Sequence, residues 1–157
     1  MTIFQHRYGN NFQVNVTGQN NQSFPSIAGH KLQNSNHYCI AWTSNDNISN
    51  LYNIYCQIYH NNLPIRTFDI EINFSNYVIS NARIAGLYNG NYAVVWSADT
   101  AGSGIFAIYC AIISDDANST IIRTKFQINT TSPYSRNYPY VAGLGSDDIY
   151  YPNGFVV

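Results

Sequence analysis

The sequence contains few charged residues and no excess of either sign. Charged side chains make up 10% of the 157 residues, and 7 Lys and Arg stand against 8 Asp and Glu. A protein that follows the phosphates of a nucleic acid needs a basic face that displaces counterions. The composition therefore argues against nucleic acid as a partner.

Long apolar runs are also missing. No run approaches the length of about 18 residues that a transmembrane helix needs, so the sequence predicts no membrane span. The first seven residues, MTIFQHR, lack the charged region and the apolar stretch of a signal peptide. Hydrophobic residues nevertheless make up 45% of the chain, which is enough for the core of one domain.

Aromatic and turn-forming residues are abundant. The chain contains 14 Tyr, 8 Phe and 22 Asn. Aromatic side chains suit the pleated surface of a sheet, and Asn caps turns and tolerates positive φ. Short apolar runs lie between Asn, Gly, Ser and Pro, and no window has a convincing helical period. The predicted fold class is all-β.

Four segment types recur in a fixed order, in units of about 55 residues. The clearest type contains Ile27, Ile84 and Val141, which follow one another at intervals of 57 residues. The segments are 25–29, 82–87 and 140–144; 37–42, 91–96 and 154–157; 3–8, 54–59 and 108–113; and 12–15, 70–73 and 126–129. We interpret residues 1–157 as a single repeat domain, with complete units near 24–75 and 80–131 and half-units at 1–17 and 138–157.

Each unit is expected to form four strands, which is the size of a propeller blade. Gly29, Gly86 and Gly143 lie at one repeated position, in a segment whose small residues suit a crowded inner strand. Trp42 and Trp96 end the second strand of their units and are predicted to pack between units rather than to bind a ligand. Because a propeller typically closes with about four to eight blades, three units predict a longer repeat protein, an assembly of copies or a β-trefoil.

The segments 12–17 (FQVNVT), 25–29 (PSIAG), 89–96 (NGNYAVVW) and 54–59 (IYCQIY) resemble a repeat of large surface or secreted proteins of bacteria and protists. That repeat occurs in tandem arrays beside calcium-binding or adhesion modules. The resemblance spans essentially the whole chain and implies a propeller-like array, an extracellular or cell-surface location and no defined activity. Segment 43–47 (TSNDN) departs from the family, which has an Asp-Gly-rich turn there. Segment 114–121 (SDDANSTI) is similar to a degenerate Asp-box, a turn motif of sialidase-like blades.

Motifs for catalysis are mostly absent. The sequence has no serine-nucleophile elbow, Walker loop or zinc-protease motif, and no pair of carboxylates can be placed across a sugar. The sequence predicts no cofactor. Calcium is the one alternative for which residues can be named, because hard cations bind carboxylates and loop carbonyls. The candidate ligands, which recur in predicted loops without a complete calcium-loop motif, are Asp46, Asp99, Asp116, Asp147 and Asp148.

The cysteines and histidines do not form a predicted metal site. Cys56 and Cys110 share one position in two units, and we expect all three thiols, including Cys39, to be buried. Buried thiols do not decide between an oxidising and a reducing compartment. A Cys39–Cys56 bridge is a geometrical alternative, but the second unit has Ala93 in place of Cys39, so the pattern does not repeat. The four histidines occupy no common repeat position and set up no convergence on zinc; they are His6, His30, His37 and His60.

Six Asn-x-Ser/Thr sequons are candidates for N-glycosylation, and they begin at Asn15, Asn21, Asn47, Asn73, Asn118 and Asn129. Three of them recur at the same position in successive units. That regularity leaves two readings open, namely a glycosylated secreted protein and a turn capped by Asn and Thr.

The leading hypothesis is a non-catalytic, propeller-like repeat segment of a surface or secreted protein. It would act as a scaffold or adhesion module and bind a protein or glycan ligand through its loops. Its partners would include further copies of the chain or adjacent repeats of a longer chain. The alternatives are a carbohydrate-binding β-trefoil lectin, with Tyr or Trp stacked on sugars, and a sialidase-like glycosidase.

Overall fold

The computed structural model describes residues 12–15, 21–29, 36–45, 52–65, 70–72, 78–115, 121–129, 134–144 and 154–157. Within these ranges the chain forms eleven β-strands in open antiparallel sheets and contains no helix. The predicted all-β class is confirmed. Accordingly, the described part of the chain offers no helix of the length and hydropathy that a membrane span requires.

The first sheet contains β1 (Asn21–Gly29), β2 (His37–Asn45), β3 (Tyr52–His60), β4 (Leu63–Pro64) and β5 (Ile70–Ile72). The first three strands pair in chain order, and β3 also pairs with β4 near its end and with β5 near its start. The turn between β3 and β4 consists of Asn61 and Asn62, whose φ values are 50° and 65°. Two successive positive φ angles are typical of a tight hairpin turn, and Asn tolerates them.

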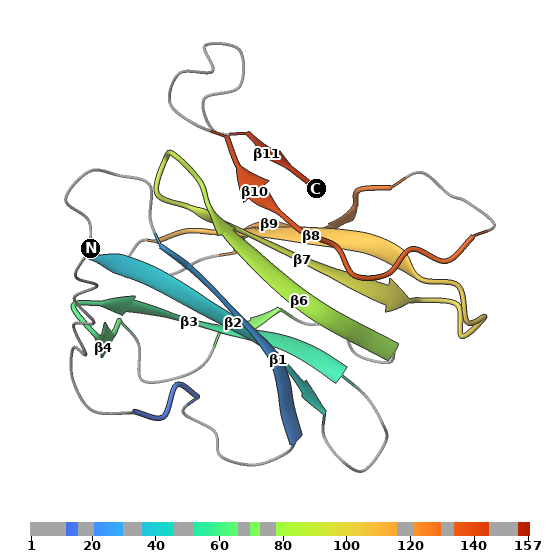
Figure 1. Ribbon diagram of the computed structural model, residues 1–157, viewed down its shortest axis with the longest axis horizontal. Helices are drawn as coiled ribbons and strands as arrows, with labels where there is room; N and C mark the ends of the chain where they lie inside the picture. The colour runs from blue at the N-terminus through green and yellow to red at the C-terminus, as the bar shows by residue number, and fades with distance from the viewer. Residues whose placement is uncertain are drawn as a thin grey trace, which may run out of the picture.

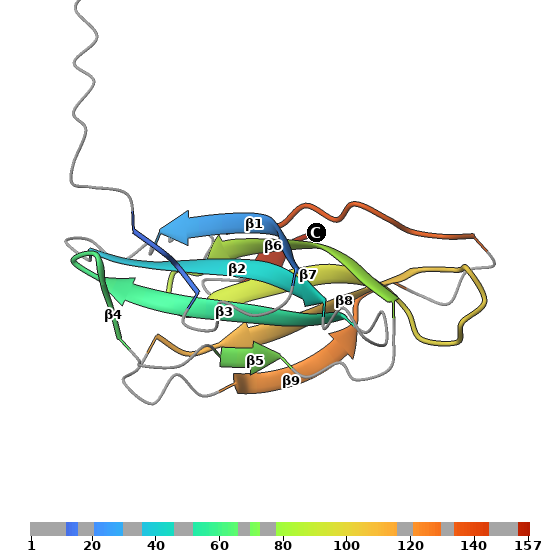
Figure 2. The ribbon, with the colours of Figure 1, turned by 90° about the horizontal axis from the view of Figure 1, so that it is seen from below.

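The second sheet contains β6 (Val78–Gly86), β7 (Tyr92–Asp99), β8 (Ala107–Ile113) and β9 (Ile121–Gln127), paired in chain order. A short third sheet pairs β10 (Ala142–Gly143) with β11 (Phe155–Val156). Figure 1 shows β6 between β1 and β10, and Figure 2 shows β1 and β6 along one edge of the molecule with β5 and β9 along the opposite edge. The strands therefore follow the order of the four recurring segments.

The main hydrophobic core lies between the first two sheets, where β6 contacts β1, β2 and β3. Trp96, Tyr92 and Ile58 are all completely buried. Fully burying a large apolar side chain contributes about 1.5–3 kcal/mol, so this contact dominates the stability of the pair of sheets. The first sheet supplies Cys39, Ala41, Ile54, Cys56, Ile58 and Ile72, and the second supplies Ile79, Ala82, Ile84, Tyr92, Val94, Trp96, Ala98, Ala111 and Ile113.

The second sheet is covered on both faces. Every residue of β7 is buried. The first sheet covers one face, and a second cluster, which includes Ala93 and Val95, packs against Val141 and Phe155 on the other. A strand buried on both faces has no polar side and reads as a continuous apolar run, which explains the sequence YAVVW.

One backbone irregularity occurs in all three units. Phe24, Asn81 and Tyr138 are spaced 57 residues apart and have positive φ values of 53°, 60° and 59°. In β1 and β6 this residue lies in a β-bulge, where the pairing register shifts. Such a backbone conformation costs about 1–3 kcal/mol for a residue other than glycine, and a bulge bends and twists its strand. The bend is thus a property of the repeat.

Two repeated glycines allow β10 to lie against β6. A Cβ built on Gly143 would overlap the backbone carbonyl of Gly86, so the missing side chain permits the close approach. Gly29, the corresponding residue of β1, is different, because a Cβ built there would meet no atom within 4 Å.

We expect Gly143→Ala to lower the free energy of unfolding by about 1–3 kcal/mol, because the rigid carbonyl of Gly86 must move away. Gly29→Ala is the matched control and should stay within about 1 kcal/mol of the wild type. Urea unfolding in dilute solution measures both. Equal losses in the two variants would contradict the close approach of β6 and β10.

Candidate functional site

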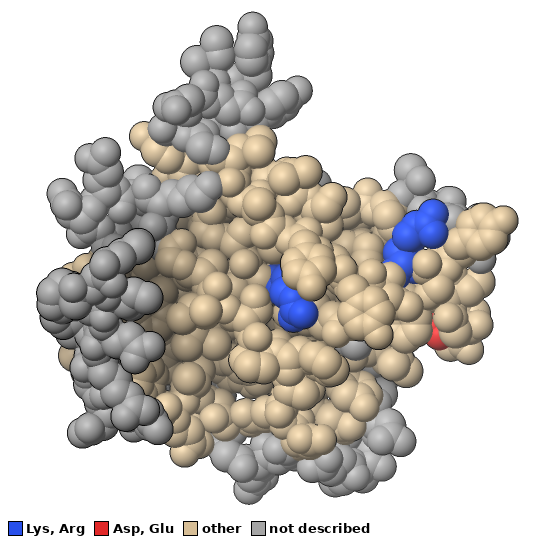
Figure 3. Space-filling model, in the orientation of Figure 1, with Lys and Arg blue, Asp and Glu red and all other residues tan. Residues whose placement is uncertain are grey.

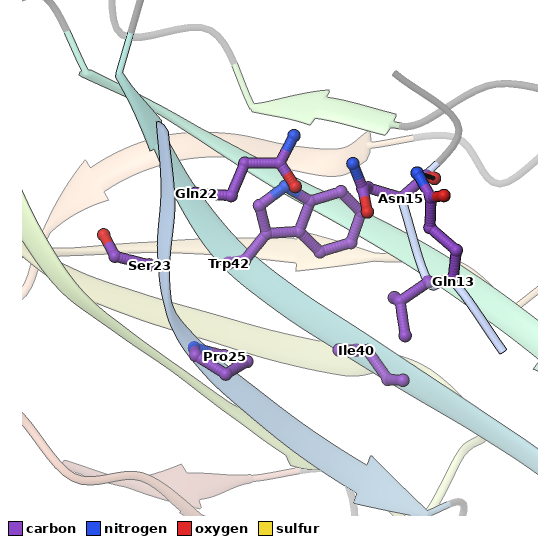
Figure 4. A pocket seen from close by; sticks show the side chains of 8 residues that line it. Gln13, Asn15, Gln22, Ser23, Pro25, Ile40 and Trp42 are labelled. Carbon is purple, nitrogen blue, oxygen red and sulfur yellow. Dashed lines mark hydrogen bonds between the residues drawn. The ribbon is translucent and has the colours of Figure 1, made fainter. Parts of the chain in front are cut away.

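A pocket lies on the outer face of the first sheet, which is the face turned away from the second sheet. Its volume is about 290 Å³, and Figure 4 shows the Trp42 ring between Gln22 on one side and Gln13 and Asn15 on the other. The lining residues are Gln13, Val14, Asn15, Gln22, Ser23, Pro25, Ile40 and Trp42. We call this surface of β1, β2 and segment 12–15 the head face.

Each of the two tryptophans stacks on a tyrosine of the neighbouring strand. Trp42 stacks on Tyr55 with ring centroids 6.3 Å apart, and Trp96 stacks on Tyr109 at the same separation. Trp96 lies in the core between the sheets, and Trp42 is only 4% exposed although it lines the pocket. A sugar stacks on the open face of an aromatic ring, so the pocket offers a ligand mainly aliphatic and amide groups.

Segment 12–15 is fixed to the end of the first sheet. The Tyr59 hydroxyl donates a hydrogen bond of 2.7 Å to the carbonyl oxygen of Val14, and the rings of Phe12 and Tyr59 are 5.5 Å apart. Gln13, Val14 and Asn15 of this segment line one side of the pocket on the head face. Of the half-unit predicted at 1–17, only this segment lies within the described residues.

The far side of the third sheet forms a second exposed apolar surface, which we call the tail face. It consists of Tyr140, Ala142 and Val156; Tyr140 is 73% exposed and Val156 is 57% exposed. The guanidinium carbon of Arg83 lies 5.5 Å from the centre of the Tyr140 ring, which is within the range of a cation–π contact. Figure 3 shows that the side of the molecule over β1 and β6 carries few charged side chains, of which most are basic, on an otherwise uncharged surface.

Two further tyrosines lie on the segment that leads to β10. Tyr134 and Tyr138 are 70% and 68% exposed, and Arg136 and Asn137 lie between them. The backbone is held in place because the Arg136 N–H donates to the carbonyl of Phe106 at 2.8 Å. We call Tyr134, Arg136, Asn137 and Tyr138 the tyrosine patch. It combines aromatic faces with hydrogen-bonding groups on an anchored segment.

A polar contact joins the first two sheets. His37 Nδ1, at the start of β2, lies 2.6 Å from Asp115 Oδ2, just after β8, and the rings of His37 and His60 are 4.4 Å apart. An imidazole held by a carboxylate also occurs in catalytic triads, where it activates a nucleophile. The repeat pattern in the sequence does not reveal this pair, because neither residue recurs between units.

The thiol nearest to this contact is not activated. Cys39 is fully buried, and burial, Cys56 and Asp115 together raise the pKa of its thiol well above the usual value of 9.0. A protonated thiol is a poor nucleophile. We therefore interpret His37 and Asp115 as a contact between sheets. Cys39, Cys56 and Cys110 are buried thiols that form no disulfide, as the sequence predicts.

Asp99, one of the candidate calcium ligands, turns toward its own loop. Burial raises the pKa of its carboxyl group, but backbone N–H groups of Gly104, Ser103, Ala101 and Gly102 lower it more, and the net pKa lies below the ordinary 3.8. Its two oxygens accept N–H donors and so serve the turn. The described residues contain no group of three or more His, Cys, Asp or Glu that could hold a metal ion. Asp46, Asp116, Asp147 and Asp148 lie outside the described residues.

We expect Asp99→Asn to lower the free energy of unfolding at pH 7 by about 1 kcal/mol or more, because it removes a charged acceptor. The folded-state pKa is depressed, so the wild type has this stability above pH 3.8 and loses it as the pH falls through the lower folded value. Urea unfolding from pH 7 to pH 2 should therefore show a shallower acid dependence in the variant.

Glu71→Gln is the control for Asp99→Asn, because Glu71 is an exposed carboxylate that bonds the Asn53 side chain. It should leave the stability nearly unchanged. A wild-type acid profile in Asp99→Asn would show that the turn does not depend on the charge.

Three of the six sequons lie within the described residues. Asn15 borders the pocket, Asn21 is exposed at the start of β1, and Asn129 Oδ1 accepts a hydrogen bond of 2.7 Å from the Ile108 N–H. The Asn129 side chain thus fixes the turn after β9, whereas glycosylation stays a prediction for every sequon. Asn47, Asn73 and Asn118 lie outside the described residues.

Comparison of the chain with protein-family models, with curated proteins and with solved structures gave no match.

Proposed function

We propose that the chain is a non-catalytic, propeller-like repeat module of a surface or secreted protein and serves as a scaffold or adhesion module. The observation that carries this proposal is the repeated packing of one inner strand on the next, β1 on β6 and β6 on β10. Neighbouring four-stranded antiparallel sheets with small residues on their inner strands are typical of propeller blades. The strands are used for packing, so binding falls to exposed connecting segments.

The separate sheets also favour blades over the β-trefoil alternative. Each of the first two sheets keeps its own strands. The first has the order β1-β2-β3, with β4 and β5 both paired to β3, and the second has the order β6-β7-β8-β9. The units of a trefoil instead contribute strands to one common barrel. The register within each sheet is continuous apart from the repeated bulge and two shifts in the pairing of β8 with β9.

Carbohydrate binding is the function that the tyrosine patch favours for this module. Tyr134 and Tyr138 expose about two thirds of their surface or more, and a tyrosine ring can stack on the apolar face of a sugar. Arg136 and Asn137 supply donors for hydroxyl groups beside the rings. An anchored backbone lowers the entropic cost of ordering such a site.

Arrays of glycans and extracellular matrix proteins, probed with the purified chain, test this function. We expect saturable binding that weakens roughly tenfold or more when Tyr134→Ala and Tyr138→Ala are combined, because the stacking surface is lost. Tyr88→Ala is the matched control, since Tyr88 is 38% exposed in the turn between β6 and β7, outside the patch.

Two results would contradict the proposal in different ways. Binding that survives the double substitution would exclude the tyrosine patch, and a lack of binding to every glycan and matrix protein would exclude the adhesion function. Turnover of chromogenic glycosides, sialosides included, would overturn the non-catalytic assignment.

A further inference from the structure

Corresponding residues of the three units differ in exposure, and the residue on β1 is the most exposed. Ile84 on β6 packs against the first sheet and is 6% exposed, and Val141 packs against the second sheet. Ile27, the corresponding residue of β1, is 64% exposed. This position is therefore covered wherever a preceding sheet is present, and it is open on β1.

A second position on β1 follows the same rule. Ala82 is completely buried where the second sheet meets the first, whereas the corresponding residue, Pro25, lines the open pocket. Gly29 likewise faces open space. The two tryptophans do not differ in this way, since Trp96 is completely buried and Trp42 is only 4% exposed. The head face thus has residues that correspond to a sheet-packing surface, and within the described part of the chain only segment 12–15 lies against it.

The tail face is exposed where the corresponding face of the second sheet is covered. Ala85 and Ala93, on the face of the second sheet that the third sheet covers, are 7% and 0% exposed. The corresponding residues of the third sheet are Ala142 and Val156, and both are exposed, Val156 by 57%. Tyr140, which corresponds to Arg83 on β6, is also exposed on this face.

We propose that the head face binds the tail face of a second copy of this chain. Both contacts inside the chain join one face of a sheet to the opposite face of the next, and the head and tail faces are the two unused members of that pair. They lie on opposite sides of the stacked sheets, so one copy does not bring them together. Their union removes Ile27, Tyr140 and Val156 from water and places a strand over the pocket.

Because this contact joins unlike faces, it builds closed rings or open chains of copies. The inference rests on the packing of sheets and is independent of any ligand of the tyrosine patch. Association of copies and ligand binding by the tyrosine patch are measured separately, so a negative result for one does not contradict the other.

Light scattering during size exclusion, over a wide range of protein concentration, tests the proposal. The wild type should have at least twice the mass of 17.7 kDa expected for one chain. Ile27→Asp and Val156→Asp should each abolish this association, because each would bury an unpaired carboxylate. Leu63→Asp is the control, since Leu63 is 70% exposed on β4, outside both faces, and should keep the wild-type mass. Circular dichroism and urea unfolding verify that each variant is folded.

Mixing the two variants gives the decisive measurement. Ile27→Asp retains an intact tail face and Val156→Asp an intact head face, so together they should form a 1:1 heterodimer although neither associates alone. A monomeric wild type at every concentration, or association that survives both substitutions, would overturn the proposal. Loss of association without rescue in the mixture would also overturn it, because like faces would then be pairing.

Discussion

The packing of one sheet's inner strand on the next sheet is the contact on which the rest of the structure depends. It needs small residues where the backbones approach, and Gly143 against Gly86 is the clearest example, since no Cβ fits there. It also needs an apolar surface on both faces of the central sheet, which is why β7 is buried along its whole length. A single sheet of four strands could not bury this surface alone. Each unit therefore depends on a neighbour for the hydrophobic burial that offsets the entropy of ordering its strands.

Because the strands pack on one another through apolar side chains, the polar contacts lie at the ends of the strands. Asp99 uses its carboxylate to hold the loop that follows β7, and Asn129 uses its amide oxygen to fix the chain after β9. His37 and Asp115 meet where two sheets end side by side. The connecting segment that carries Tyr134 and Tyr138 presents large side chains to solvent away from the contacts between the sheets. Any recognition of a ligand has to use such segments, because a strand that changes its side chains loses its packing.

The all-β class could be predicted because the alternation of short apolar runs with Asn and Gly turns is local information, and the spacing of Ile27, Ile84 and Val141 identifies the repeat. The β-bulge could not be predicted, because Phe24, Asn81 and Tyr138 share no chemistry that favours positive φ, and only their common spacing connects them. The contact between His37 and Asp115 depends on how neighbouring sheets stack, which no single unit encodes. The sequence signal for this contact lies at the strand ends. Segment 37–42 begins, and segment 108–113 ends, at the same edge of their sheets, so His37 and Asp115 could be expected to lie close together. The role of Asp99 was hidden for a related reason, since a carboxylate in a loop suits a cation and a set of N–H donors equally well.

Identical packing surfaces raise the problem of register, because repeated sheets could slide past one another or pair in the wrong order. The residue just before Ile27, Ile84 and Val141 opposes such sliding through a polar or aromatic contact that differs from one junction to the next. Ser26 accepts a hydrogen bond from the Ile84 N–H at the first junction, and Arg83 lies over the Tyr140 ring at the second. Both contacts reach from one unit's inner strand to the next, so they oppose the sliding of one sheet past another that the apolar surface alone would allow. Tyr140 occupies this position in the third unit and is 73% exposed. Its ring can therefore contact a sheet that packs on the tail face. Such a contact would fix the register of that sheet as Ser26 and Arg83 fix the register within the chain.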